Sequence, residues 1–177
     1  MKATALLKKQ HRRVQRIFER LENNESDAST LLTELANDLA AHMAIEQTIF
    51  YPAVRDVDSE LVSESYQEHA IAELALKRLL STTPDDETFV AKVTVLRELI
   101  GHHVEEEEDQ LFPEVEDIMD GEQLDALGGE MQSAFEEAFD EGYEALLPEG
   151  TATSADDANQ SPTKPPRKRA KQPSASR

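Results

Sequence analysis

The segment His42-Met-Ala-Ile-Glu46, followed by Phe50-Tyr51-Pro52, occurs twice in this chain in related form. The second copy is His103-Val-Glu-Glu-Glu107, followed by Leu111-Phe112-Pro113, and in both copies the proline comes six residues after the glutamate. Residues four positions apart lie on the same face of an α-helix, so each copy can direct an imidazole and a carboxylate toward one point. The repeated pattern predicts two helices that carry matching parts of one polar site inside a helical bundle.

Helical periodicity extends from these two segments through most of the chain. Apolar residues recur every three or four positions and no stretch alternates with a period of two, so the fold class is predicted to be all-α. With short connections between them, the long helices predict an up-down-up-down antiparallel four-helix bundle. Pro52 is expected to end or kink the second helix and Pro113 to kink the fourth. The predicted helices cover residues 3–22, 28–51, 60–80 and 86–119.

The rest of the chain divides into a further helix and a tail. A helix is expected over residues 122–147, interrupted early by Gly128-Gly129 and packed beside the bundle. The last segment is rich in proline, serine, threonine, aspartate and basic residues and has few apolar ones, so it is expected to be disordered. The predicted organisation is a bundle over residues 1–120, a C-terminal helix over 121–148 and a disordered basic tail over 149–177.

The charge of the chain is strongly negative and unevenly distributed. Its 177 residues carry a formal net charge of −19, yet residues 1–21 hold seven lysines and arginines against one acid, and residues 164–177 hold six against none. The acidic body between them repels nucleic acid and membranes and attracts cations. Contact with nucleic acid is therefore expected only through the basic tail. Since no apolar run approaches the ~20 residues of a membrane span, we expect a cytoplasmic protein with no membrane partner.

The chain contains no cysteine. This excludes disulfides, thiolate metal sites and a cysteine nucleophile. A metal would have to be bound by histidine, aspartate or glutamate, and these ligands favour iron, manganese or zinc over copper(I) or iron–sulfur clusters.

Four of the five histidines lie on the apolar stripes of four different predicted helices, and the two glutamates of the repeated pattern share those stripes. A buried carboxylate needs a partner charge or a metal, and the inward stripes of the last three helices offer no lysine or arginine. Two carboxylates and four imidazoles could hold two divalent ions, with the carboxylates bridging and the imidazoles terminal. The predicted metal ligands are His11, His42, Glu46, His69, His103 and Glu107.

Three neighbouring residues are open to more than one interpretation. Glu73, four residues after His69, is a possible additional ligand, a hydrogen-bond acceptor from a ligand, or an exposed residue. Tyr66 lies one turn before His69 and is expected to pack in the core, although it could reach a bound oxygen species. His102 points about 100° away from His103 and is expected at the rim of the site.

The doubled pattern, together with His11 and His69, resembles the hemerythrin-like (HHE cation-binding) domain over about residues 1–120. The resemblance implies an antiparallel four-helix bundle that holds two iron ions in an oxo- or carboxylate-bridged di-iron centre. It also implies a small ligand, because members of this family bind dioxygen reversibly, sense oxygen or iron, store iron, or react with peroxide or nitric oxide. Zinc or manganese would accept the same ligands.

The sequence departs in two places from the invertebrate oxygen carriers that it resembles. Those proteins have a second histidine one turn after the position of His69, where Glu73 stands here, and a His-x-x-x-x-Asp spacing where this chain has His103-x-x-x-Glu107. Fewer imidazoles and more carboxylate favour the ferric state. We therefore expect binding of dioxygen or a related small ligand for sensing, protection or iron handling instead of oxygen carriage.

Two other functions are compatible with the same sequence. One is a di-iron enzyme that acts on hydrogen peroxide or nitric oxide, in the manner of a peroxidase or catalase. Turnover of peroxide by the iron-loaded protein would distinguish it. The other is an interaction protein whose bundle is merely structural, in which case replacing His42 and His103 by alanine would leave stability and metal content unchanged. The sequence predicts neither the oligomeric state nor the physiological partner.

Overall fold

A computed structural model describes residues 1–23 and 27–147, and all regular structure within these ranges is helical. The all-α prediction is confirmed. Residues 149–177, predicted to form a disordered basic tail, lie outside the described residues. No helix in the described part of the chain is long and apolar enough to cross a membrane.

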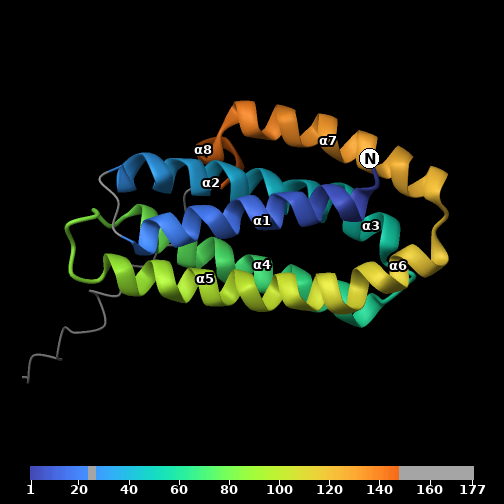
Figure 1. Cartoon of the computed structure of the whole chain (residues 1–177), viewed down its shortest axis with the longest axis horizontal. Coiled ribbons are helices and arrows are strands. Elements are labelled where there is room, and N and C mark those ends of the chain that lie inside the picture. Colours follow the sequence, from blue (N-terminus) through green and yellow to red (C-terminus); the bar gives the residue numbers. More distant parts are fainter. Residues whose placement is uncertain (24–26, 148–177) are drawn as a thin grey trace, which may run out of the picture.

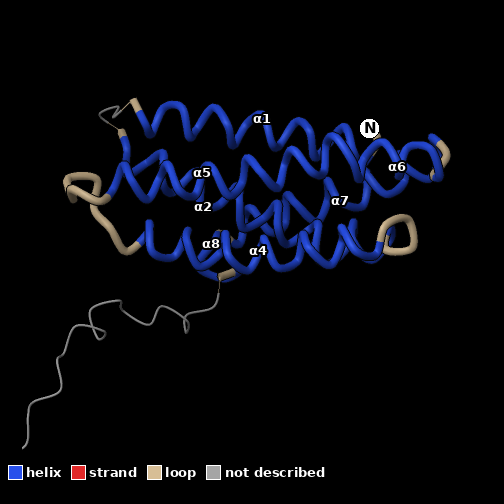
Figure 2. The backbone as a smooth tube through the Cα atoms, turned by 90° about the horizontal axis from the view of Figure 1, so that it is seen from below, coloured by secondary structure: helices blue, strands red, loops and turns tan. Residues whose placement is uncertain are grey.

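Four long helices lie side by side along the long axis of the molecule (Figure 1). Helix α1 packs against α2 and α5, and α4 also packs against both α2 and α5, so the four helices enclose one core. Helix α7 covers the outer side of α1 and α2 (Figure 1), and the single-turn helix α8 contacts α2. Loops join the helices within the described residues (Figure 2). The bounds are α1 (Ala3–Glu22), α2 (Ala28–Ile45), α4 (Ser59–Leu80), α5 (Phe89–Glu106), α7 (Gly121–Glu141) and α8 (Tyr143–Leu146).

A layer of polar side chains divides the apolar core into two clusters. On α1, Leu7 belongs to one cluster and Val14 to the other, with His11 between them. On α2, Leu39 and Ile45 are separated in the same way by His42. The buried histidines therefore lie where the two halves of the core meet, at one common level of the bundle.

Two helices contain a π-helical turn that the sequence pattern did not predict. Helix α2 continues into η1 (Glu46–Phe50) and α3 (Tyr51–Val54), and α5 continues into η2 (Glu107–Leu111) and α6 (Phe112–Ile118). Each wide turn begins at the glutamate of the repeated pattern and is closed by an N–H five residues later that donates to the glutamate carbonyl. The predicted end or kink at the prolines is thus a widened turn, after which the helix continues.

The π-turn explains the position of the proline in the pattern. Because Tyr51 N–H donates to Glu46, the next carbonyl, that of Gln47, would need a donor at position 52. Pro52 has no N–H to offer. The hydroxyl of Tyr66 donates to this carbonyl instead, at 3.0 Å. Tyr66 therefore has a structural role at the turn.

Helix α5 begins at Phe89, later than the predicted start at Asp86. The carboxylate of Asp86 accepts hydrogen bonds from the backbone N–H and hydroxyl of Thr88, which holds these residues in a turn. With the corrected start, His103 lies as far into α5 as His42 lies into α2. The two copies of the pattern therefore reach the same level of the bundle.

Helix α7 runs through Gly128-Gly129 without the predicted interruption, and it ends at Gly142, whose φ is 82°. The absence of a side chain at Gly128 serves packing. A Cβ there would overlap the carbonyl oxygen of Met1 and lie 2.8 Å from the backbone nitrogen of Ala3. Gly128 therefore lets α7 cross directly over the start of α1.

Replacing Gly128 by alanine is expected to destabilise the protein by about 1–3 kcal/mol, because backbone has to move to admit the methyl group. Its neighbour Gly129 provides a matched control, since an added Cβ there meets nothing within 4 Å. Gly129→Ala is expected to stabilise the helix by up to about 1 kcal/mol. Urea unfolding of both variants measures the difference, and equal effects at the two positions would contradict the close contact.

Asp38, which is not one of the clustered histidines and glutamates, is expected to make the stability of the fold depend on pH. Its side chain is 3% exposed and accepts a hydrogen bond of 2.8 Å from Arg13 Nε. Burial raises the pKa of Asp38 from 3.8 to about 6, although Arg13 offsets part of the effect. Since the folded state then holds the proton more tightly than the unfolded state, stability is lost as pH rises from about 4 to about 6.

The variant Asp38→Asn tests this dependence. Between pH 4 and 6.5, the free energy of unfolding of the wild type is expected to fall by roughly 2 kcal/mol more than that of the variant. Denaturant unfolding at a series of pH values measures both slopes. If the free energy of unfolding changed with pH equally in the wild type and the variant, the pKa of Asp38 would be the same in the folded and unfolded chain, which would contradict the prediction.

Candidate metal centre

The six predicted ligands meet in the polar layer at the centre of the bundle. Each long helix contributes one histidine, and each π-turn contributes its first residue, a glutamate. None of the six is more than 5% exposed to solvent. Helices α1, α2, α4 and α5 carry His11, His42, His69 and His103, and the turns η1 and η2 carry Glu46 and Glu107.

Each carboxylate lies between two imidazoles from different helices. Oε2 of Glu46 is 3.2 Å from Nε2 of His42, on the same helix, and 3.3 Å from Nε2 of His69 on α4. Oε2 of Glu107 is 3.8 Å from Nε2 of His103, again on its own helix, and 3.4 Å from Nε2 of His11 on α1. The two copies of the pattern therefore contribute equivalent halves of one cluster.

The imidazoles themselves form two pairs. The rings of His11 and His42 have centroids 4.9 Å apart, and the Nε2 atoms of His69 and His103 are 3.0 Å apart. Among the described residues, two fully buried groups of ligand atoms lie close enough together to hold a metal ion, each consisting of one histidine pair and Glu46, and a third group, Glu68, His102 and Glu106, lies nearer the surface. Glu46 is the residue that both buried groups share.

The second nitrogen of every histidine has a partner outside the cluster, and the sequence analysis did not identify these residues. Nδ1 of His11 lies 2.8 Å from Glu108, Nδ1 of His42 lies 2.8 Å from Oε1 of Gln10, and Nδ1 of His103 lies 2.8 Å from Glu68. The side-chain amide of Gln47 is 3.1 Å from Nδ1 of His69. Such contacts fix the orientation of each ring and turn its Nε2 toward the cluster.

Tyr51 is a further member of the cluster that the sequence analysis missed. Its hydroxyl donates to Oε1 of Glu107 at 3.0 Å and lies 3.2 Å from Nε2 of His69. Burial, together with the nearby charges of Glu107 and Glu46, raises the pKa of Tyr51 well above 10. The phenol therefore keeps its proton. The signal was present, because Tyr51 belongs to the aromatic-proline part of the repeated pattern.

Three residues named from the sequence lie outside the cluster. Glu73, the possible additional ligand, is paired with Lys77 at 2.6 Å and is not brought to the other six. Tyr66 binds the Gln47 carbonyl at the π-turn. His102 is 63% exposed, as expected for a rim residue.

The residues present fit a metal centre because four of their buried inward atoms have no hydrogen-bond partner. Both carboxylate oxygens of Glu46, Oε2 of Glu107 and Nε2 of His11 are buried without a hydrogen bond. Leaving such atoms unpaired in the core is costly. Imidazole nitrogen and carboxylate oxygen are also the donor types that iron, manganese and zinc accept. Cations placed among these atoms would satisfy them.

The electrostatics of the cluster point the same way. Burial, and then the charge of Glu107, raises the pKa of Glu46 well above its ordinary value. Burial, and then repulsion from His103, lowers the pKa of His69 from 6.5 to about 3. Burial alone would raise the pKa of Glu107, but the adjacent histidines, His103 first, lower it to about 2. A divalent cation bound here would supply the charge that keeps both carboxylates ionised and the imidazoles neutral.

Comparison with known proteins identifies the family. Residues 2–115 match the hemerythrin HHE cation-binding domain, and the chain belongs to that family. The fold is similar to the crystal structure of an HHE cation-binding-domain protein from Mycobacterium kansasii, with a TM-score of 0.72 over 80% of this chain and 89% of that chain at 22% identity. The family binds cations, and the histidine and glutamate groups of this chain could hold a metal.

The chain is also 25% identical over 132 residues to a DNA nickase from Nostoc sp. (strain PCC 7120). The matched segment is 73% of this chain but only 38% of the nickase, so the similarity is confined to part of that protein.

Proposed function

We propose that the chain is a non-haem di-iron protein of the cytoplasm that binds dioxygen or a related small ligand for sensing, protection or iron handling. The observation that carries the proposal is the arrangement of two histidine pairs around the shared carboxylate of Glu46, whose oxygens have no hydrogen-bond partner, with Glu107 between His11 and His103. Manganese or zinc would accept the same donors. We also infer that the four long helices alternate in direction, which is supported by the short connections between consecutive helices.

The residues divide naturally between two ions. His11 and His42 would hold one iron, His69 and His103 the other, with Glu46 and Glu107 between them. Iron at these positions would supply redox chemistry and open coordination positions for a small ligand. A ligand set of four imidazoles and two carboxylates, without Glu73, agrees with a centre that is not specialised for oxygen carriage.

The surrounding side chains restrict what can reach the site. The six predicted ligands and Tyr51 are nearly or fully buried. The ring of Phe112 stacks on that of His11, with the ring centroids 6.0 Å apart. The ring of Phe50 packs edge-on against that of Phe112, with the ring centroids 5.7 Å apart. Such a site excludes bulk water and large substrates and admits only small molecules. This supports a diatomic or peroxide ligand.

The alternative function is an enzyme that acts on hydrogen peroxide or nitric oxide. Tyr51 favours this alternative, because its hydroxyl holds a proton 3.0 Å from Oε1 of Glu107 inside the cluster. A phenol that keeps its proton beside the reacting centre would donate a hydrogen bond to a peroxide held there and orient it.

Metal analysis and optical spectroscopy test the proposal. The iron-loaded full chain is expected to contain about two irons and to show near-ultraviolet absorption under air that is lost after dithionite. Binding without turnover predicts a stable spectral change on adding peroxide or nitric oxide, and the enzymatic alternative predicts repeated consumption of the added compound. Two bound irons whose spectrum responds to none of these reagents would refute both functions.

A further inference from the structure

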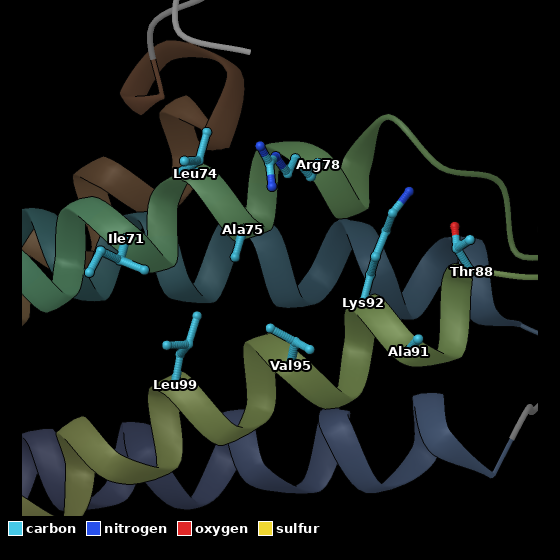
Figure 3. A pocket seen from close by; sticks show the side chains of 9 residues that line it. All are labelled: Ile71, Leu74, Ala75, Arg78, Thr88, Ala91, Lys92, Val95 and Leu99. Carbon is cyan, nitrogen blue, oxygen red and sulfur yellow. The ribbon is translucent and has the colours of Figure 1, made fainter. Parts of the chain in front are cut away.

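Helices α4 and α5 form an apolar groove on the outside of the bundle (Figure 3), and none of the six predicted ligands lines it. The groove has a volume of about 390 Å³, and its floor and walls include Leu74 and Leu99. Ile71 and Val95 are 54% and 53% exposed at its edges. Isolated exposed aliphatic side chains are common, but here several of them gather on one face of a very acidic protein.

Charged residues flank this apolar strip in a regular order on both helices. On α4, Glu64, Ile71 and Arg78 follow one another at intervals of seven residues. On α5, Lys92, Leu99 and Glu106 have the same spacing. Residues seven apart lie two turns apart on the same helix face. Each helix therefore carries an acid, an aliphatic side chain and a base along one line, and the acid on α5, Glu106, is 19% exposed and lies 3.6 Å from His102.

The two lines are aligned with each other in space. The segment 81–88 joins the end of α4 to the start of α5, so Arg78 and Lys92 both lie near this connection. Glu64 and Glu106 lie at the opposite end, beyond the level at which His69 contacts His103. The surface is therefore basic at one end, apolar in the middle and acidic at the other, with its charged ends about 20 Å apart.

We propose that this face binds a second copy of the same chain. A two-fold axis near Ile71 and Leu99 would place the apolar strips of both copies in contact. It would also set Arg78 and Lys92 of each copy against Glu64 and Glu106 of the other. A two-fold interface requires a self-complementary surface, and a strip whose charge reverses sign about an apolar centre has this property.

Charge argues for a second copy over the basic tail of the same chain. The tail segment 164–171 carries the same sign as Arg78 and Lys92, which flank the groove. A net charge of −19 opposes self-association over most of the surface. Association is therefore directed to the face where opposite charges meet, which fixes both the location and the antiparallel orientation of the interface.

Sedimentation velocity of the full chain at about 100 μM and low ionic strength tests this inference. The wild type is expected to sediment with twice the chain mass of 19.8 kDa. Arg78→Glu is expected to raise the dissociation constant at least about tenfold, because repulsion replaces attraction at two symmetric contacts. Combining it with Glu64→Arg, which restores opposite charges across the axis, is expected to recover the dimer.

Arg12→Glu is the matched control, since it makes the same charge change at an exposed position on α1. It is expected to leave the dimer intact, and far-ultraviolet circular dichroism verifies that all variants remain helical. A monomeric wild type would overturn the proposal and leave the groove to the tail or to another protein. Equal weakening by Arg12→Glu and Arg78→Glu, or failure of the double variant to restore the dimer, would overturn it as well.

Discussion

Replacing Glu46 by glutamine is expected to reduce the metal content from about two ions per chain to less than one. Glu46 belongs to both buried groups of potential ligand atoms, so its loss weakens both positions at once. The neutral amide is a poor ligand for these cations. Replacing a residue that only hydrogen-bonds a ligand typically lowers metal affinity about 10- to 100-fold, and loss of a ligand carboxylate itself should lower it further. Elemental analysis after reconstitution with ferrous iron measures the result.

The same substitution is expected to leave the metal-free protein at least as stable as the wild type. Both carboxylate oxygens of Glu46 are buried without a hydrogen bond, and burial raises the pKa of this group. An amide of similar shape removes the cost of burying a charge. Opposite effects on metal content and on apo stability would indicate a residue kept for metal binding and not for packing.

Glu73→Gln is the matched control for this experiment. Glu73 follows His69 at the same spacing at which Glu46 follows His42, but its carboxylate pairs with Lys77. The variant is expected to retain both ions. Loss of metal from Glu73→Gln, or full metal content in Glu46→Gln, would contradict the arrangement of the centre.

Removal of the metal is expected to have the second large effect, a fall in the unfolding temperature of about 10 °C or more. A cation present at 1,000 times its dissociation constant stabilises the folded state by about 4 kcal/mol. In a domain of this size that energy corresponds to a shift of this order. Calorimetry of the loaded chain with and without a chelator measures the change.

Glu46→Gln again supplies the control for metal removal. Because this variant should bind little metal, the chelator is expected to have almost no effect on its unfolding temperature. A wild type that unfolds at the same temperature with and without chelator would instead favour a bundle whose histidines are only structural. That reading also predicts normal stability and metal content when His42 and His103 are both replaced by alanine.

The helices, and the meeting of the six predicted ligands in the core, could be predicted from the sequence because both depend on the same periodicity. A histidine on an apolar stripe faces the core wherever the helix is regular, and His11, His42, His69 and His103 all lie on such stretches. The start of a helix depends on local side-chain bonds as well as on periodicity. The start of α5 depends on a turn at Asp86–Thr88, whose side-chain bonds compete with the helix over the same residues.

Tyr51 could not be placed from periodicity because the helix is not regular where it matters. In an α-helix Tyr51 would point about 140° away from Glu46. The π-turn widens the helix so that the N–H of Tyr51 reaches the carbonyl of Glu46, one turn back, and the ring turns toward the cluster. The residues that contact the Nδ1 atoms of the histidines were not predicted, for a different reason. Glu68 and Glu108 are polar residues next to the stripe, and only the packing of neighbouring helices brings them to His103 and His11.

Each glutamate of the cluster contacts a histidine from the other half of the bundle, and this affects how the site is assembled. Helices α1 and α2 form one half of the bundle and α4 and α5 the other, and each half supplies one histidine pair and one glutamate. Glu46 of the first half reaches His69 of the second, and Glu107 of the second reaches His11 of the first. The first half contains one complete group of potential ligands, His11, His42 and Glu46, whereas the group of His69 and His103 includes Glu46 of that first half. This second position therefore forms only when both halves are docked, so uptake of a second ion is a direct readout of the assembled bundle.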